Sequence, residues 1–293
     1  MDPRDVANMG VDNASIRLLF LCLARDCEDT IPLFIAYLKS LESCGFSCIA
    51  IIGENGSSDK TRDLIEQAAG PQISLLDTAF MAGCKSRLIR MAKGRQALLD
   101  VARARGIGND YVCVMDLDNV MAMPPAPAAV RAAIRRLQTD TTLFAIGATS
   151  FPVYYDVLSL RVEGLEFLSN LYKETTDAKK RPFSYYRFHQ ERIYKYQRLM
   201  TSATPVFCAS SFNGFCLYNA ADFSTGSYRA RDEAEVCEHV NFNLSIAAIT
   251  GKKMMIAPGL VIHAPKDHIP VSFLRFCSDR IWERLTISRM KQR

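Results

Sequence analysis

The sequence has little glycine and proline, 15 and 12 in 293 residues, while 49% of its residues are hydrophobic. Those proportions exclude collagen-like, low-complexity and disordered chains. Long apolar runs are also missing: the longest near the N-terminus is residues 18–24, and a spanning helix needs about 18 apolar residues. We therefore expect a globular chain with a core large enough to fold without disulfides or metals.

Signals for export and for metal-binding cysteines are missing as well. The first apolar run follows Asp2, Asp5 and Asp12 rather than basic residues, and no small-residue cleavage site comes after it. The ten cysteines form no C-x-x-C pair, and no histidine stands at zinc-ligand spacing from a cysteine pair. This usage favours reduced, buried thiols. We expect a cytoplasmic protein.

Positive charge is concentrated at the C-terminus. Residues 266–293 hold seven Lys or Arg against three Asp or Glu and so carry +4 of the net charge of +5. Phe273, Cys277, Ile281 and Leu285 follow helical spacing there, which predicts a basic helix. Two roles stay open: packing on the core with a solvated basic face, or peripheral contact with an anionic inner membrane face. No helix-turn-helix, zinc finger or aromatic RNA motif accompanies the charge, so no nucleic-acid partner is expected.

Apolar runs alternate with amphipathic segments along the first half of the chain. The runs that predict buried strands are residues 17–24, 48–53, 111–115 and 143–148. The segments that predict helices are residues 30–44, 59–69, 86–105 and 129–138. A further helix over 238–250 should end at Gly251, before a strand over 254–263. Alternation of this kind predicts an α/β domain, which we place at residues 1–265.

Residues 173–204 interleave Lys and Arg with Tyr and Phe and have poor periodicity. We expect a mobile excursion on the acceptor side of the domain. Aromatic and basic side chains together suit a sugar acceptor, a lipid phosphate or a nucleic-acid strand. A solvated loop or helix without any ligand is an equal alternative.

Polar residues follow two of the predicted strands, where ligands lie in sheets of this class. Asp116 and Asp118 come at the end of one strand, and two carboxylates at that spacing can reach a hard cation that binds a diphosphate. Residues 54–61 (ENGSSDKT) follow another strand. In that segment Gly56 permits a tight turn and Asp59 can cap the next helix, while Glu54 has no such structural explanation.

Six segments in order resemble glycosyltransferases of the GT-A fold, chiefly the family-2 type. They are residues 23–26 (LARD), 54–61 (ENGSSDKT), 94–96 (GRQ), 116–118 (DLD), 238–239 (EH) and 261–263 (VIH). A weaker resemblance, to fungal capsule-type mannosyltransferases, rests on residues 154–156 (YYD) with Arg161, 212–215 (FNGF) and 237–240 (CEHV). The resemblance implies a Rossmann-like mixed central sheet flanked by helices.

The resemblance also implies roles for individual residues. Glu54 stands where an Asp contacts the nucleobase, with Ala24 and Arg25 lining the same pocket. Arg95 would approach the nucleotide. Asp116 would face the ribose or the metal, Asp118 would ligate Mn²⁺ or Mg²⁺ directly, and His263 would bind metal or diphosphate. Gly214 would let the backbone approach the donor sugar or the acceptor.

The chain departs from the family at the pair that supplies the catalytic base. The family has Glu-Asp there, and this chain has Glu238 followed by His239. Either side chain can take a proton from an acceptor hydroxyl, and we favour Glu238 because a helix N-terminus holds it ionised. A reaction that retains the anomeric configuration would need neither Glu238 nor His239 as a base. Inversion and retention therefore stay open, as does the choice between uridine and guanosine.

The expected reaction is metal-dependent transfer of a sugar from a UDP- or GDP-sugar to a glycan or lipid-linked acceptor in polysaccharide or glycoconjugate synthesis. A sugar nucleotidyltransferase is one alternative, although that class has a glycine-rich loop after the first strand and residues 22–28 contain no glycine. The other is a non-catalytic protein of the same fold that binds sugar nucleotides or polysaccharide.

Overall fold

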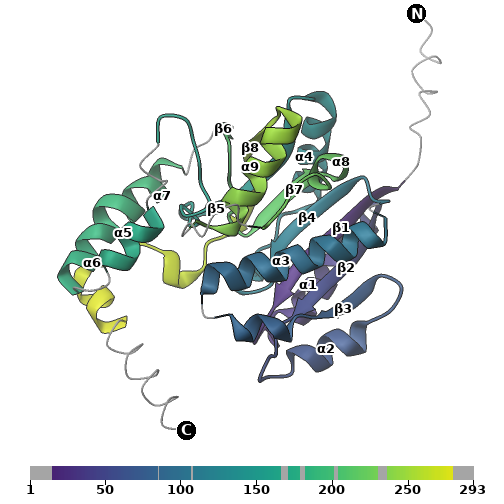
Figure 1. Ribbon diagram of the computed structural model, residues 1–293, viewed down its shortest axis with the longest axis horizontal. Helices are drawn as coiled ribbons and strands as arrows, with labels where there is room; N and C mark the ends of the chain where they lie inside the picture. The colour runs from purple at the N-terminus through teal and green to yellow at the C-terminus, as the bar shows by residue number, and fades with distance from the viewer. Residues whose placement is uncertain are drawn as a thin grey trace, which may run out of the picture.

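The computed structural model describes residues 15–84, 86–106, 108–165, 171–178, 182–200, 204–229 and 236–279. Its centre is an eight-stranded sheet with the order β3-β2-β1-β4-β7-β5-β8-β6 (Figure 1). The strands are β1 (Ile16–Ala24), β2 (Phe46–Glu54), β3 (Ile73–Asp77), β4 (Tyr111–Asp116), β5 (Leu143–Phe151), β6 (Val206–Cys208), β7 (Phe215–Asn219) and β8 (Lys253–His263). Only β7 and β6 pair antiparallel with their neighbours, so the sheet is mixed and mostly parallel.

Helices cover both faces of the sheet. The main ones are α1 (Ile31–Ser43), α2 (Thr61–Ala68), α3 (Arg87–Ala104), α4 (Pro127–Thr139) and α9 (Glu238–Thr250). Side chains of α1, α2 and α4 belong to one buried cluster, and those of α3 and α9 belong to the other. Four short helical elements connect the strands and helices: η1 (Ala79–Gly83), η2 (Asn119–Ala122), α8 (Ala220–Phe223) and η5 (Lys266–His268). The predicted α/β class is confirmed.

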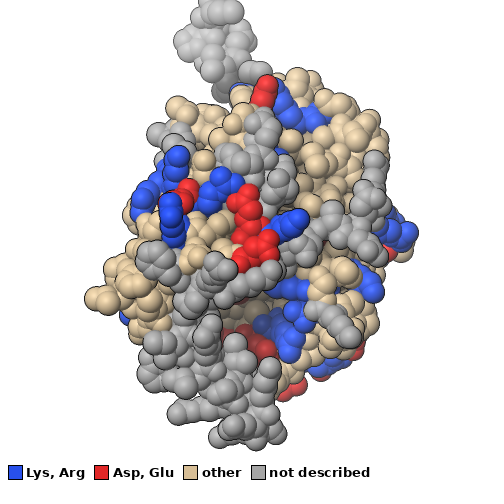
Figure 2. Space-filling model, turned by 60° about the vertical axis from the view of Figure 1, so that its left-hand side comes forward, with Lys and Arg blue, Asp and Glu red and all other residues tan. Residues whose placement is uncertain are grey.

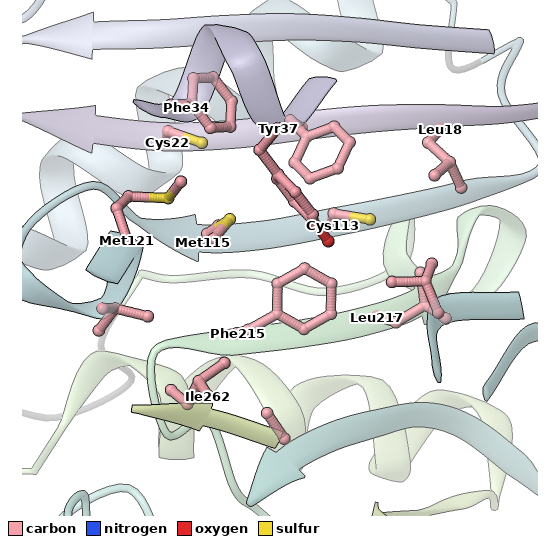
Figure 3. Packing of buried hydrophobic residues seen from close by; sticks show 14 of the residues in the cluster. Leu18, Cys22, Phe34, Tyr37, Cys113, Met115, Met121, Phe215, Leu217 and Ile262 are labelled. Carbon is pink, nitrogen blue, oxygen red and sulfur yellow. The ribbon is translucent and has the colours of Figure 1, made fainter. Parts of the chain in front are cut away.

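Alternation along the strands explains the two clusters. In β1, Leu18, Phe20 and Cys22 face α1, whereas Leu19 and Leu21 face α3. Successive side chains of a strand point to opposite faces, so a continuous apolar run is what a strand covered on both sides requires. Figure 3 shows the first cluster, in which rings from α1 meet side chains of the central strands.

Most of the cysteines serve as core residues, as the sequence predicts. All ten are free thiols, and six of them are buried: Cys22, Cys27, Cys48, Cys113, Cys208 and Cys216. Burial raises the pKa of these thiols, which keeps them protonated and unreactive. Cys44 is exposed, and Cys84, Cys237 and Cys277 are half-buried, so these four depart from the prediction.

The segment that lacked periodicity is helical wherever it is described. It contains α5 (Leu171–Ala178), α6 (Pro182–Phe188), η4 (His189–Tyr194) and α7 (Lys195–Leu199), which stand apart from the sheet in Figure 1. Residues 273–279 form a helix that packs on α6, with the rings of Tyr186 and Phe273 5.0 Å apart. Residues 280–293 of the predicted basic helix lie outside the described residues. None of the described helices is long and apolar enough to cross a bilayer.

Candidate active site

A cleft of about 370 Å³ opens at the carboxyl-terminal edge of the parallel strands. Its walls come from the segments that follow β1, β2, β4, β5 and β8, together with one face of α3 and the first turn of α9. The charged residues that line it are Arg25, Arg87, Arg90, Arg95, Asp116, Asp118, Asp156 and Glu238. Figure 2 shows one face of the molecule, where acidic and basic side chains stand close together above a hollow in the surface. The site therefore lies where a doubly wound sheet binds its ligands.

Arg95 is the centre of this cleft. Its side chain, on α3, is only 2% exposed. Nη2 donates a hydrogen bond to Oδ1 of Asp116 at 2.7 Å, and Nε donates one to Oε1 of Glu238 at 3.3 Å. The guanidinium carbon lies 4.9 Å from the centre of the Phe212 ring. One arginine thus ties the end of β4 to the start of α9.

The charge of Arg95 is balanced inside the protein. Burial opposes the charged form, but the carboxylates of Asp116 and Glu238 outweigh it and raise the pKa of Arg95. Nη1 of Arg95 is buried and has no hydrogen-bond partner in the described part of the chain. A buried N–H group without an acceptor is unfavourable, so this atom is suited to an anionic ligand.

Asp116 and Asp118 stand together at the end of β4, as the sequence predicts. Asp116 uses Oδ1 for Arg95, and Oδ1 of Asp118 accepts from the backbone N–H of Val120 at 3.2 Å. No group of three or more His, Cys, Asp and Glu side chains suited to a metal occurs among the described residues. Two carboxylates fit a cation that takes its remaining ligands from water and a diphosphate, which is how Mg²⁺ is commonly held.

Glu238 and His239 occupy the first turn of α9, and both are buried. The imidazole of His239 stacks on Phe212, with ring centres 3.6 Å apart and planes 11° from parallel. Burial, and then the charge of Arg95, hold the pKa of His239 well below its usual range. His239 is therefore neutral near pH 7. Both side chains line the cleft, and Glu238 is the acidic one of the two.

Glu54 does not line the cleft. Its Oε1 accepts from the backbone N–H of Ser57 at 2.6 Å, and its Oε2 accepts from Nη1 of Arg62 at 3.1 Å. Oε1 thus holds the turn at Gly56, whose φ is +63°, and Oε2 ties the end of β2 to α2. These bonds engage both carboxylate oxygens, and the expected contact of Glu54 with a nucleobase stays a prediction. The neighbouring Asn55 lines the cleft instead, and its buried Oδ1 has no partner among the described residues.

His263 and Gly214 also lie outside the cleft lining. His263 ends β8, with its Nδ1 2.9 Å from the carbonyl oxygen of Ala264, and His268 lines the cleft in its place. Gly214 has a φ of +76°, and a Cβ there would come within 2.5 Å of the Tyr155 hydroxyl. Packing against Tyr155 therefore explains this glycine, and its carbonyl accepts from the Asp116 N–H at 3.0 Å. The expected approach of this backbone to the donor sugar or the acceptor stays a prediction.

Asp156 is a cleft carboxylate to which the sequence reasoning gave no role. The backbone N–H groups of Tyr155 and Asp156 donate to the same Oδ1 of buried Asn213, at 3.1 and 3.2 Å. This places the loop after β5 over the cleft. Burial raises the pKa of Asp156, and the nearby carboxylates of Asp116 and Glu238 raise it further. The only sequence signal for it was its place in the segment YYD.

A larger cavity, of about 680 Å³, lies at the opposite edge of the sheet. Its charged residues are satisfied within the protein. Asp110 pairs with Arg17 at 2.8 Å, and Arg103 donates to the carbonyl oxygens of Ser224 and Gly226. The antiparallel strand β7 ends there, at Asn219, but the parallel strands β1, β2 and β4 end at the cleft around Arg95, which is therefore the better candidate.

Comparison with known proteins finds likeness in structure only: no family model matches the chain, and no curated protein sequence matches it. The Mycobacterium tuberculosis glucosyl-3-phosphoglycerate synthase, solved with Mn²⁺, UDP and glucosyl-3-phosphoglycerate, is 11% identical with a TM-score of 0.42, over 86% of this chain and 70% of that one. Residues 1–349 of Staphylococcus aureus TarS are 9% identical with a TM-score of 0.47, over 85% and 60%. The mannosyl-3-phosphoglycerate synthase of Rubrobacter xylanophilus is 11% identical with a TM-score of 0.44, over 89% and 66%. At these identities the likeness concerns the fold.

Proposed function

We propose that the chain is a GT-A glycosyltransferase that moves a sugar from a UDP- or GDP-sugar to a hydroxyl of a glycan or lipid-linked acceptor. The observation that carries the proposal is the cluster of Arg95 with Asp116 and Glu238, beside Asp118, at the carboxyl edge of the sheet. A buried arginine with an unpartnered N–H next to two strand-end carboxylates suits a ligand that combines a diphosphate with a divalent cation.

The nucleoside would lie over the ends of β1 and β2. Ala24 and Arg25 line the cleft there, and Asn55 offers a buried amide oxygen that can accept from a nucleobase N–H. Asn55 thus takes the role that the sequence suggested for Glu54. Uracil and guanine both present such a donor, so this contact does not distinguish UDP from GDP.

The diphosphate would lie over the end of β4. Asp118 and Asp116 would hold Mn²⁺ or Mg²⁺, which when bound offsets negative charge on the leaving diphosphate. Nη1 of Arg95 would donate to a phosphate oxygen, adding a charge-assisted hydrogen bond in a site shielded from water.

Transfer breaks the bond between the anomeric carbon and the diphosphate oxygen, and the electron pair leaves with the diphosphate. The acceptor oxygen forms the new bond to carbon and gives up its proton. In an inverting reaction we assign that proton to Glu238, because it is the carboxylate at the start of α9 and His239 is held in its stack on Phe212. Arg95 keeps Glu238 in place through its Nε.

Calorimetric titration of the purified chain with UDP and with GDP, with and without Mn²⁺, tests the proposal. We expect one of the two to bind at least tenfold more tightly with Mn²⁺ than without it, a difference of about 1.4 kcal/mol. CDP and ADP serve as controls for base recognition. Equal, weak binding of all four nucleotides in both conditions would contradict the proposal.

A further inference from the structure

Two arginines of the cleft have no role in the site described above. Arg87 and Arg90 lie in the first turn of α3 and line the same cleft as Arg95. Neither makes an ion pair with an acidic side chain among the described residues. The other cleft arginines do: Arg25 lies 3.5 Å from Asp26, and Arg95 is paired twice.

The position of Arg87 and Arg90 in the first turn of α3 is electrostatically unfavourable for the helix. The N-terminus of a helix carries partial positive charge, and a basic side chain there loses about 0.3–1 kcal/mol where an acidic one would gain it. The first turn of α3 contains no acidic residue. The side chain of Ser86 caps the helix by accepting from the N–H of Ile89, and no described carboxylate forms an ion pair with either arginine. Helix stability therefore does not explain them.

All three arginines lie on one face of α3. At 100° per residue, positions 87, 90 and 95 fall within about 140° of one another, and at 1.5 Å per residue Arg87 and Arg95 are about 12 Å apart along the axis. The deep end of this row is Arg95, with its buried, unpartnered Nη1. The outer end is the helix N-terminus. Positive charge thus extends from the cleft floor to its rim, and at the rim no acidic side chain of the described residues pairs with Arg87 or Arg90.

We propose that Arg87 and Arg90, with the N-terminus of α3, form a subsite for a phosphate group at the rim of the cleft. Arginine side chains and helix N-termini both favour phosphate oxygens. Resting on the proposed function, the subsite binds one of two groups of the same chemistry: the diphosphate of the donor, or a phosphate carried by the acceptor.

The probes are inorganic pyrophosphate and UDP or GDP, titrated into the full chain without and with Mn²⁺. The test variant is the double substitution Arg87→Gln and Arg90→Gln, which keeps a polar side chain at each position and removes the charge. Arg135→Gln is the matched control, because Arg135 is an exposed helical arginine on α4 that lies outside the cleft. Circular dichroism and the thermal midpoint show whether each variant is folded.

We expect the double variant to bind pyrophosphate without Mn²⁺ at least tenfold more weakly than the wild type, and the control to bind it unchanged, because only the double variant loses charge-assisted hydrogen bonds to phosphate oxygens. If UDP or GDP affinity with Mn²⁺ falls in parallel, the bound group is the donor diphosphate. If nucleotide affinity stays within twofold, the group belongs to the acceptor. Unchanged pyrophosphate binding in the folded double variant would overturn the subsite.

The two proposals fail in different ways. If pyrophosphate binding depends on Arg87 and Arg90 but no nucleoside diphosphate binds better than pyrophosphate with Mn²⁺, the subsite stands and the proposed transferase function is wrong. If Mn²⁺-dependent nucleotide binding is present and pyrophosphate binding ignores both arginines, the proposed function stands and the subsite is wrong.

Discussion

Replacing Arg95 with methionine removes the group that balances two carboxylates in the cleft. Arg95 and Glu238 are 2% and 6% exposed, whereas Asp116 is 28% exposed and can be hydrated. The substitution leaves Glu238 as a buried charge with no cation in hydrogen-bond range. We therefore expect a large loss of stability, and we expect Glu238 rather than Asp116 to cause most of it.

The magnitude follows from the burial. Removing one partner of a buried ion pair typically destabilises a protein by about 3–5 kcal/mol, because the other charge stays desolvated. Methionine fills much of the vacated space, so the cavity contribution is small. Glu238→Gln alone should be milder, because Arg95 keeps its 2.7 Å bond to Asp116. In the double variant the uncompensated charge is gone, and we expect it to be more stable than Arg95→Met alone by about 1–3 kcal/mol.

Urea unfolding of the wild type, both single variants and the double variant gives the four free energies of this cycle. Coincident transitions by circular dichroism and tyrosine fluorescence would show that a single unfolding free energy is defined. A loss below about 1 kcal/mol for Arg95→Met would refute the reasoning. So would a double variant less stable than Arg95→Met.

Three further predictions concern other residues of the site. Glu238→Gln should lower turnover by about 10²–10⁴ with nucleotide affinity retained, and His239→Asn should lower it less, as steady-state kinetics and calorimetry can show; the reverse order would move the base to His239. Because folding lowers the pKa of His239, the unfolded chain binds more protons than the folded one below about pH 6.5. The free energy of unfolding should therefore fall below that pH by up to about 1.4 kcal/mol per pH unit. His239→Asn should remove this pH dependence in urea titrations, and an unchanged dependence in the variant would contradict the burial argument. Gly214→Ala should destabilise the protein by roughly 2–4 kcal/mol, because Gly214 has a positive φ and an added Cβ would contact Tyr155. Gly259→Ala is the control, because the space around Gly259 is open, and it should shift the thermal midpoint little. Equal shifts for the two variants would contradict the packing explanation.

The sequence predicted the strands and helices that follow a simple periodicity. The run at 17–24 became β1 and the run at 111–115 became β4, because a strand buried on both faces needs unbroken apolar sequence. The short edge strand β3 was missed, since only Ile73 of its five residues is buried. The strand β7 was missed as well, because its antiparallel place between β4 and β5 is decided by tertiary pairing.

At the site, the sequence located the residues that follow strands and missed those that depend on distant contacts. Asp116 and Asp118 could be found from a strand followed by two acids. The bond between Arg95 and Glu238 joins residues 143 positions apart, and no local pattern encodes such a pair. That Asn55 rather than Glu54 lines the cleft depends on which of two adjacent side chains the turn at Gly56 directs into it. A resemblance by segment order does not resolve a difference of one residue.

The metal-dependent affinity of Asp118→Asn for UDP and GDP tests the central claim most directly. Asp63→Asn is the matched control, because Asp63 is an exposed carboxylate in the first turn of α2. We predict that the wild type and the control gain at least tenfold in affinity for one nucleotide when Mn²⁺ is added, and that Asp118→Asn, still folded, gains less than twofold. An Asp118→Asn variant that keeps the full Mn²⁺ effect would contradict the assignment of this cleft as a metal and diphosphate site.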